Sequence, residues 1–257
     1  RLRSRNAYIN RRYGYELEPA PSLGLPLAYA RPRSRAADDR VFRHLPRPRR
    51  GARLLDVGCG SGAFVARAIA LGWNAQGIDN DEAAVRAGQA AGLPLSTTPI
   101  EELAVSMRGS FDAVTMAHVI EHVPHPVTFL GAARALLRDS GTLWLATPNL
   151  DSSGHRRFGE RWMHLDPPRH LVLFGQLAID RALGSAGFEI LSTPSSASGT
   201  IASYAQSSRI AQGRLPISDS RVPPLVRAGG LAAGLRSLLQ STLSEELIRL
   251  ARPRTGR

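Results

Sequence analysis

The sequence contains a single cysteine, Cys59, among its 257 residues. One cysteine excludes an intramolecular disulfide framework and a zinc site built on cysteine thiolates. No stretch of about 18 apolar residues occurs without a charge, so we expect no transmembrane helix. No apolar region follows the arginine-rich residues 1–5, so we expect no secretory signal there and a cytoplasmic location.

Lysine is absent altogether, and all 33 basic residues are arginine, which against 21 acidic residues gives a net charge of +12. The charge is unevenly distributed along the chain. Residues 1–50 contain 13 arginines and 4 acidic residues, and residues 201–257 contain 9 arginines and 3 acidic residues. Residues 51–200 contain 11 arginines and 14 acidic residues. Basic ends can attract nucleic acid or an anionic membrane. We interpret these arginines as a solvated surface, and because residues 51–200 are mildly acidic we do not expect nucleic acid as a partner.

The chain divides by composition into three segments. Residues 1–50 are rich in arginine, proline and tyrosine, and we expect an irregular lead-in or cap with one short helix around Ser34–His44. Residues 51–193 have the pattern of a folded domain, described below. Residues 194–257 form a third segment, in which 194–224 resemble a linker and Leu225–Leu250 favours two short amphipathic helices. These helices can pack on the fold or make peripheral contact with a membrane surface.

Short apolar runs alternate with helical stretches through the middle segment. We expect strands at Leu54–Val57, Asn74–Asp79, Leu95–Thr97, Phe111–Ala117, Gly141–Thr147 and Phe188–Leu191, and helices at Gly62–Leu71, Asp81–Ala91, Pro126–Leu137 and Gln176–Ala186. This alternation predicts an α/β fold with a mostly parallel sheet and helices on both faces. Ligands bind such sheets at the carboxyl ends of the strands.

Two motifs fall at those strand ends. The run Leu-Asp-Val-Gly-Cys-Gly-Ser-Gly, residues 55–62, places glycines at alternate positions between a strand and a helix, so the backbone can approach a ligand closely. The next strand ends at Asp79, 21 residues after Gly58, which fits one βαβ unit. A carboxylate there can accept hydrogen bonds from ribose hydroxyls. An NAD-dependent oxidoreductase is one enzyme class with this pattern.

Together with Phe111–Val114 and His118–Val123, these motifs resemble class I S-adenosylmethionine-dependent methyltransferases, in the bacterial small-molecule branch related to the ubiquinone-pathway O-methyltransferases. The resemblance covers about Arg53–Leu191. It implies a Rossmann-like, doubly wound, mostly parallel seven-stranded sheet and S-adenosylmethionine as cofactor. The implied reaction is methyl transfer to a small-molecule acceptor, and we expect a hydroxyl acceptor and in-line displacement. An RNA methyltransferase that uses the basic ends is the alternative within the same family.

The resemblance also implies roles for individual residues. The turn residues Gly58, Cys59, Gly60 and Gly62 would follow the methionine part of the cofactor, and Asp56 would orient the turn and the methionine ammonium. Asp79 would bind the ribose hydroxyls, with Asn80 beside the adenine. Relatives carry an aspartate after the third strand that contacts the adenine, and it is missing here, so we assign that contact to the backbone and Ile100. Ala117 and His118 would lie beside the sulfonium.

A hydroxyl acceptor benefits from a base or a cation that lowers its pKa. The candidates are His118, Glu121, His122, His164, Asp166 and His170. We select His122, His164, His170 and Asp166 as catalytic residues, the last three on a loop that would cover the acceptor. If residues 118–122 are helical, His118, Glu121 and His122 share one face, as a divalent metal would need. Because His118 stands where relatives have an acid, we assign no metal ligands. The sequence does not fix the acceptor or the oligomeric state.

Overall fold

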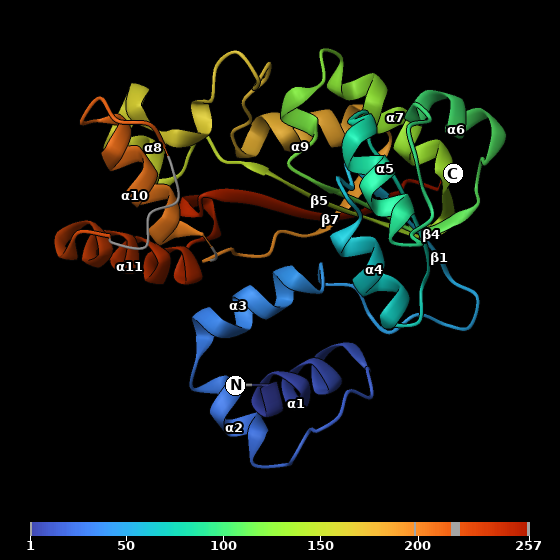
Figure 1. Ribbon diagram of the computed structural model, residues 1–257, viewed down its shortest axis with the longest axis horizontal. Coiled ribbons are helices and arrows are strands. Elements are labelled where there is room, and N and C mark those ends of the chain that lie inside the picture. Colours follow the sequence, from blue (N-terminus) through green and yellow to red (C-terminus); the bar gives the residue numbers. More distant parts are fainter. Residues whose placement is uncertain (1, 198, 217–221, 256–257) are drawn as a thin grey trace. The chain divides into compact units, whose positions relative to one another are not determined.

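A seven-stranded sheet organises the computed structural model, which describes residues 2–197, 199–216 and 222–255. The strands are β1 (Arg53–Val57), β2 (Asn74–Ile78), β3 (Leu95–Ser96), β4 (Phe111–Ala117), β5 (Leu137–Pro148), β6 (Phe188–Ser192) and β7 (Glu246–Pro253). Their order across the sheet is β3-β2-β1-β4-β5-β7-β6. Figure 1 labels β1, β4, β5 and β7 of this sheet. The pairs among β1 to β5 are parallel, whereas β7 runs antiparallel to β6. This confirms the mostly parallel, Rossmann-like sheet.

The helices between these strands are α4 (Ala63–Ala70), α5 (Glu82–Ala90), α6 (Ile100–Ser106), α7 (Pro126–Leu136) and α9 (Gln176–Ser185), with the 3-10 turn η1 (Ile120–His122) after β4. The chain steps from β1 to β3 in one direction and from β3 through β4 to β5 in the other. Because parallel crossovers are right-handed, this reversal places α4 and α5 on one face and α6 and α7 on the other. The carboxyl ends of β1 and β4 therefore lie at the switch point where such folds bind ligands.

Strand and helix chemistry explains these elements. β1 is almost wholly buried, with its apolar residues Leu54 and Leu55 at 0% exposure. Helix α5 begins after Asp81, whose carboxylate accepts hydrogen bonds from the backbone N–H groups of Ala83 and Ala84, because aspartate is a favoured helix N-cap. β5 begins at Leu137, four residues before the expected start, because Phe111 of β4 pairs with it there.

The chain forms two compact units, each assembled from three segments. The helical unit comprises Arg1–Pro46, Pro148–Gln176 and Pro194–Ile248, and the sheet unit comprises Arg47–Thr147, Leu177–Thr193 and Arg249–Arg257. The sheet unit holds most strand residues and the helices just described. The three segments that we distinguished in the sequence are contiguous, whereas each unit is interleaved along the chain.

The helical unit contains α1 (Leu2–Tyr13), α2 (Gly24–Tyr29), α3 (Pro32–Val41), α8 (Ser153–Phe158), α10 (Thr200–Ile210) and α11 (Pro224–Leu239), with 3-10 turns η2 (Gly159–Arg161), η3 (Met163–Leu165) and η4 (Ser241–Leu243). Polar contacts hold it together. Asp39 accepts hydrogen bonds from the hydroxyls of Tyr8 and Tyr13, and Arg40 pairs with the buried Glu246. Glu245 is 2% exposed and accepts hydrogen bonds from Trp162, Ser203 and the Gly154 N–H.

Three expectations about secondary structure were wrong. The lead-in has the expected short helix, as α3, but it also contains α1 and α2 and is not irregular; side-chain contacts such as those to Asp39, which no apolar periodicity reveals, hold its turns. The expected linker contains α10, and the expected pair of helices in Leu225–Leu250 is one helix, α11, followed by η4 and the start of β7. Residues 198 and 217–221 of the expected linker lie outside the described residues. Within the described ranges, no helix has both the length and the apolar character that a membrane span requires.

Candidate functional site

The turn after β1 has the close-packed geometry that its glycines predict. Gly58, Gly60 and Gly62 all have positive φ, at 70°, 53° and 84°. A Cβ on Gly58 would clash with Cγ2 of Val119, and one on Gly62 would lie 2.7 Å from Cδ1 of Leu93. Gly60 differs, because a Cβ there would meet no atom within 4 Å. The turn therefore needs Gly58 and Gly62 for its own packing and leaves open space at Gly60.

Asp79 ties the end of β2 to this turn. Its Oδ2 accepts a hydrogen bond of 2.7 Å from the Gly60 N–H, and its Oδ1 accepts one of 2.9 Å from the Asp81 N–H. A carboxylate offers about four lone-pair sites, so each oxygen retains the capacity to accept a further hydrogen bond. The structure thus brings together Asp79 and the glycine turn.

Asp56 lies within β1 and is 1% exposed. Its Oδ1 accepts a hydrogen bond of 2.9 Å from the Thr115 hydroxyl on the neighbouring strand β4. Thr115 was not among the predicted residues, although a polar residue inside the apolar run Phe111–Ala117 was a usable signal. This geometry is compatible with a role of the Asp56 carboxylate in orienting the glycine turn that follows β1.

The remaining predicted cofactor residues differ in their exposure. Cys59 is buried. A Cβ on Gly77 would lie 2.7 Å from Sγ of Cys59, so the glycine at position 77 allows the end of β2 to approach the turn that follows β1. Asn80 is exposed directly after Asp79. Ile100, at the start of α6, is 3% exposed and lies in the core. Ala117 is the last residue of β4.

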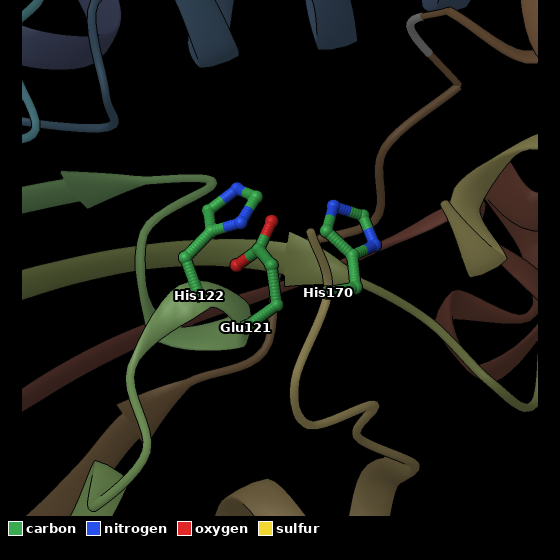
Figure 2. Close-up of side chains that lie close together, drawn as sticks. All are labelled: Glu121, His122 and His170. Carbon is green, nitrogen blue, oxygen red and sulfur yellow. The ribbon is translucent and has the colours of Figure 1, made fainter. Parts of the chain in front are cut away.

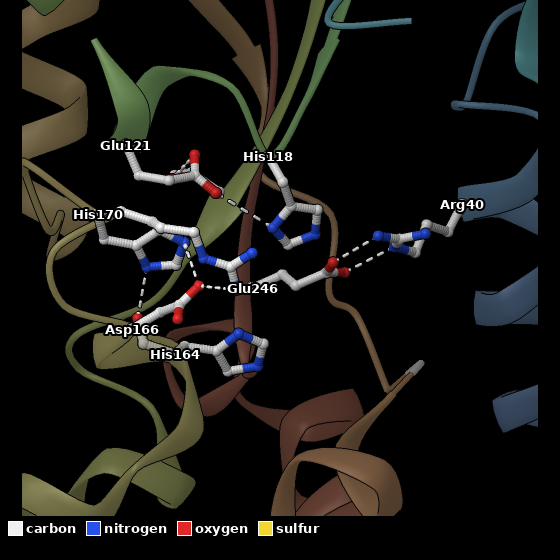
Figure 3. A network of polar contacts seen from close by, with 9 residues as sticks. Arg40, His118, Glu121, His164, Asp166, His170 and Glu246 are labelled. Atoms are coloured by element: carbon white, nitrogen blue, oxygen red, sulfur yellow. Dashed lines mark hydrogen bonds and ion pairs between the residues drawn. The ribbon is translucent and has the colours of Figure 1, made fainter. Parts of the chain in front are cut away.

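His118 follows Ala117 in a left-handed conformation, with φ at 56°. Its Nδ1 lies 3.2 Å from Oε1 of Glu121, which is 0% exposed, and a third of the His118 side chain remains exposed (Figure 3). The other Glu121 oxygen, Oε2, accepts a hydrogen bond of 2.9 Å from the Thr147 hydroxyl at the end of β5. Burial alone would raise the pKa of Glu121, but the hydrogen bonds from His118 and Thr147 and the charge of His118 outweigh it and hold this pKa below its ordinary value.

The expectation of one helical face at residues 118–122 was wrong. The positive φ of His118 ends β4 abruptly, and only Ile120–His122 forms a 3-10 turn, η1. Figure 2 shows Glu121 and His122 on this turn; Glu121 is buried, whereas His122 is exposed. Within the described part of the sheet unit, Glu121 pairs with His118, and ligand atoms of Glu121 and His122 also lie within 4.8 Å of each other.

The other three predicted catalytic residues lie in the helical unit. His164 is on η3 and its ring packs against Trp162, with centroids 5.0 Å apart. The ring Nδ1 of His170 lies 2.6 Å from the His164 carbonyl oxygen, and Asp166 pairs with Arg169 at 2.5 Å (Figure 3). The structure thus gathers His164, Asp166 and His170 in one loop, whose polar groups bind one another.

Comparison with known proteins identifies the family. A family model described as a methyltransferase domain matches residues 29–193. The chain belongs to this family. Its glycine turn, strand order and Asp79 are those expected of a class I S-adenosylmethionine-dependent methyltransferase.

Relatives of this methyltransferase chain include a ubiquinone biosynthesis O-methyltransferase of Xanthomonas campestris pv. campestris. It is 39% identical over 105 residues, which cover 38% of this chain and 44% of the relative. The chain therefore spans less than half of that relative's length. Among solved structures, a SAM-dependent methyltransferase from Archaeoglobus fulgidus has 17% identity and a TM-score of 0.56, covering 89% of this chain and 99% of that one.

A second solved structure shows how widely the methyltransferase fold is used. The [4+2]-cyclase SpnF is 24% identical, with a TM-score of 0.56 over 94% of this chain and 86% of that one. At such identities both structures show the fold alone. Function must therefore be argued from the site.

The residues present fit the cofactor that the methyltransferase family implies. The open space at Gly60 admits a ligand against the backbone, and the lone-pair capacity of Asp79 suits two ribose hydroxyls. The buried Ile100 fits less well, because its side chain is already covered by the protein. Thr147, which holds Glu121, is a further residue that the sequence analysis missed; its signal was a polar residue at the end of the apolar run Leu143–Ala146.

Proposed function

We propose that the chain is an S-adenosylmethionine-dependent methyltransferase that methylates a hydroxyl group of a small molecule. One observation carries this proposal: a half-buried histidine, His118, paired with a buried carboxylate, Glu121, directly beside the glycine turn. The adjacency follows from packing, because the residue after His118, Val119, fills the space where Gly58 lacks a side chain.

Three residues would hold the cofactor. Asp79 would accept hydrogen bonds from the ribose hydroxyls, and the open backbone at Gly60 would lie along the ligand. Asp56, held by Thr115, would present negative charge to the ammonium through the turn. When bound, S-adenosylmethionine supplies a methyl group already activated by its positive sulfur.

The protein's contribution to the chemistry is alignment and proton removal. An acceptor hydroxyl becomes a better nucleophile when a base takes its proton, and this effect is worth about 10²–10⁴ in rate. His118 is placed for this role because its Nδ1 faces Glu121, and Nε2 would be the ring nitrogen that takes the proton. Glu121 would fix the ring orientation and stabilise the imidazolium that forms, as in other histidine–carboxylate pairs.

The relatives support a hydroxyl acceptor, since the Xanthomonas protein is named an O-methyltransferase of ubiquinone biosynthesis. A phenol is therefore the first acceptor class to test. The residues on the loop that carries His164, Asp166 and His170 remain candidates for acceptor contact under this proposal.

Cofactor binding is tested by calorimetric titration with S-adenosylmethionine. We expect the wild-type chain to bind, and Asp79→Asn to bind about tenfold or more weakly, because hydrogen bonds to a charged acceptor are lost. Glu82→Gln is the matched control: it removes the same charge from the first turn of α5, where Glu82 contacts Arg86. Absence of binding to the wild-type chain would refute the proposal.

Turnover is tested by formation of S-adenosylhomocysteine with a panel of phenols, sugars and amines. Phenol-dependent or sugar-dependent turnover that is lost in His118→Asn supports hydroxyl methylation. Turnover with amines alone, or with RNA alone, would overturn the assignment of the acceptor while leaving the cofactor intact.

A further inference from the structure

Helix α11 packs with its small residues inward. Gly230, Ala233, Gly234 and Ser237 are buried, and α11 lies against α10 within the helical unit (Figure 1). A Cβ on Gly230 would lie 2.9 Å from Cα of Ile201 on α10, so the two backbones approach closely. The inner face of α11 therefore has no room for large side chains.

Three leucines of α11 point outward instead. Leu225, Leu235 and Leu239 are 88%, 51% and 89% exposed, and Ala228 and Ala232 are also exposed. Their spacing of three, four, three and four residues makes one continuous stripe along the helix. A surface helix normally buries such a stripe against the core and keeps polar residues outside. The inverted arrangement marks an interaction face, since exposed apolar patches on folded proteins generally serve binding.

The same segment is basic. Residues 199–240 contain five arginines and one aspartate, and Arg214, Arg227 and Arg236 are exposed. Leu215, next to Arg214, is 76% exposed. The apolar stripe is thus accompanied by positive charge that is almost unopposed by acids.

We propose that the outward stripe of α11, formed by Leu225, Ala228, Ala232, Leu235 and Leu239, docks on an anionic lipid surface. Leucines would enter the boundary between headgroups and acyl chains while the arginines bind lipid phosphates, which is how interfacial helices bind. A second copy of the chain suits this face less well, because a two-fold interface would bring arginines against arginines. This proposal is independent of the catalytic one.

The test is co-sedimentation of the full chain with two kinds of vesicle, phosphatidylcholine alone and an equimolar mixture with phosphatidylglycerol. We expect binding to the mixed vesicles that weakens with added salt. Leu235→Gln combined with Leu239→Gln should weaken it at least about tenfold, because two leucines no longer enter the apolar layer. Arg227→Gln and Arg236→Gln should each weaken it about fivefold on the anionic vesicles.

The matched control replaces exposed apolar residues elsewhere, Val105→Gln on α6 and Leu177→Gln on α9, which are 86% and 72% exposed. These variants should bind like the wild type, and circular dichroism should show all variants folded. Failure to bind mixed vesicles, or equal losses in the control, would overturn the proposal. So would a dimer in sedimentation velocity without lipid that the Leu235→Gln, Leu239→Gln variant abolishes, because the stripe would then cover a second copy.

Discussion

The Nδ1 atom of His118 lies 3.2 Å from Oε1 of Glu121, on a backbone that turns left-handed at the histidine. If His118 is the base, His118→Asn should reduce kcat by about 10²–10⁴ and leave the affinity for S-adenosylmethionine nearly unchanged. Asparagine is chosen because it tolerates positive φ. Steady-state kinetics and calorimetry on the same preparation measure the two effects, and His125→Asn, an exposed histidine nearby, is the control.

Replacing Glu121 by glutamine separates its charge from its packing. Glu121→Gln keeps an acceptor for the Thr147 hydroxyl but no longer stabilises a protonated His118. We expect a lower rate and an acid limb of the pH–rate profile that moves to lower pH. An unchanged profile together with a lower melting temperature would instead identify Glu121 as purely structural.

The glycine turn allows a three-way comparison of stability and binding. Gly51, Gly58 and Gly60 all have positive φ, so alanine at each costs about 1–2 kcal/mol of backbone strain. Gly58→Ala should cost about 2 kcal/mol more, because its Cβ meets Val119, whereas nothing surrounds a Cβ at Gly51 or Gly60. Gly60→Ala should be as stable as Gly51→Ala yet bind S-adenosylmethionine more weakly. Urea unfolding and calorimetry provide the two measurements.

His44 gives the helical unit a predictable dependence on pH. Burial lowers the pKa of His44 from 6.5 to about 4, with Arg12 and Arg40 adding to the effect against the opposing charge of Asp39. The unfolded chain therefore takes up this proton first, and stability should fall by about 3 kcal/mol as the pH falls from 6.5 to about 4. Thermal unfolding across this range should show a smaller decrease in His44→Asn, whereas His125→Asn should behave like the wild type.

Glu245 is expected to be the most sensitive buried carboxylate of the helical unit. It accepts hydrogen bonds from Trp162, Ser203 and the Gly154 N–H, so Glu245→Ala leaves three buried donors without an acceptor. We expect a loss of about 3 kcal/mol or more in the free energy of unfolding, against about 1 kcal/mol for Ser203→Ala. Equal losses in the two variants would show that Trp162 and Gly154 find other partners.

Sequence reasoning succeeded where the signal is local. The glycine turn, the Asp81 cap and Asp79 at a strand end follow from backbone rules that act over a few residues. Sequence reasoning failed where the local structure depends on residues far away in the sequence. α10 buries Thr200, Ser203, Tyr204 and Ser207, so its inner face carries no apolar periodicity. Likewise, the left-handed turn at His118 depends on Glu121 and on β5, and no helical spacing rule could anticipate it.

The ion pair between Arg40 and Glu246 joins residues that are 206 positions apart in the sequence. The hydrogen bond from the Trp162 ring N–H to Glu245 joins residues that are 83 positions apart. During synthesis Glu246 is therefore made 206 residues after Arg40, and Glu245 is made 83 residues after Trp162. The entropic cost of closing so long a loop grows only with the logarithm of its length, which a few buried contacts can offset. A ribosome-bound chain halted before residue 245 should accordingly carry an unfinished helical unit, because Arg40 and Trp162 would still lack their acidic partners.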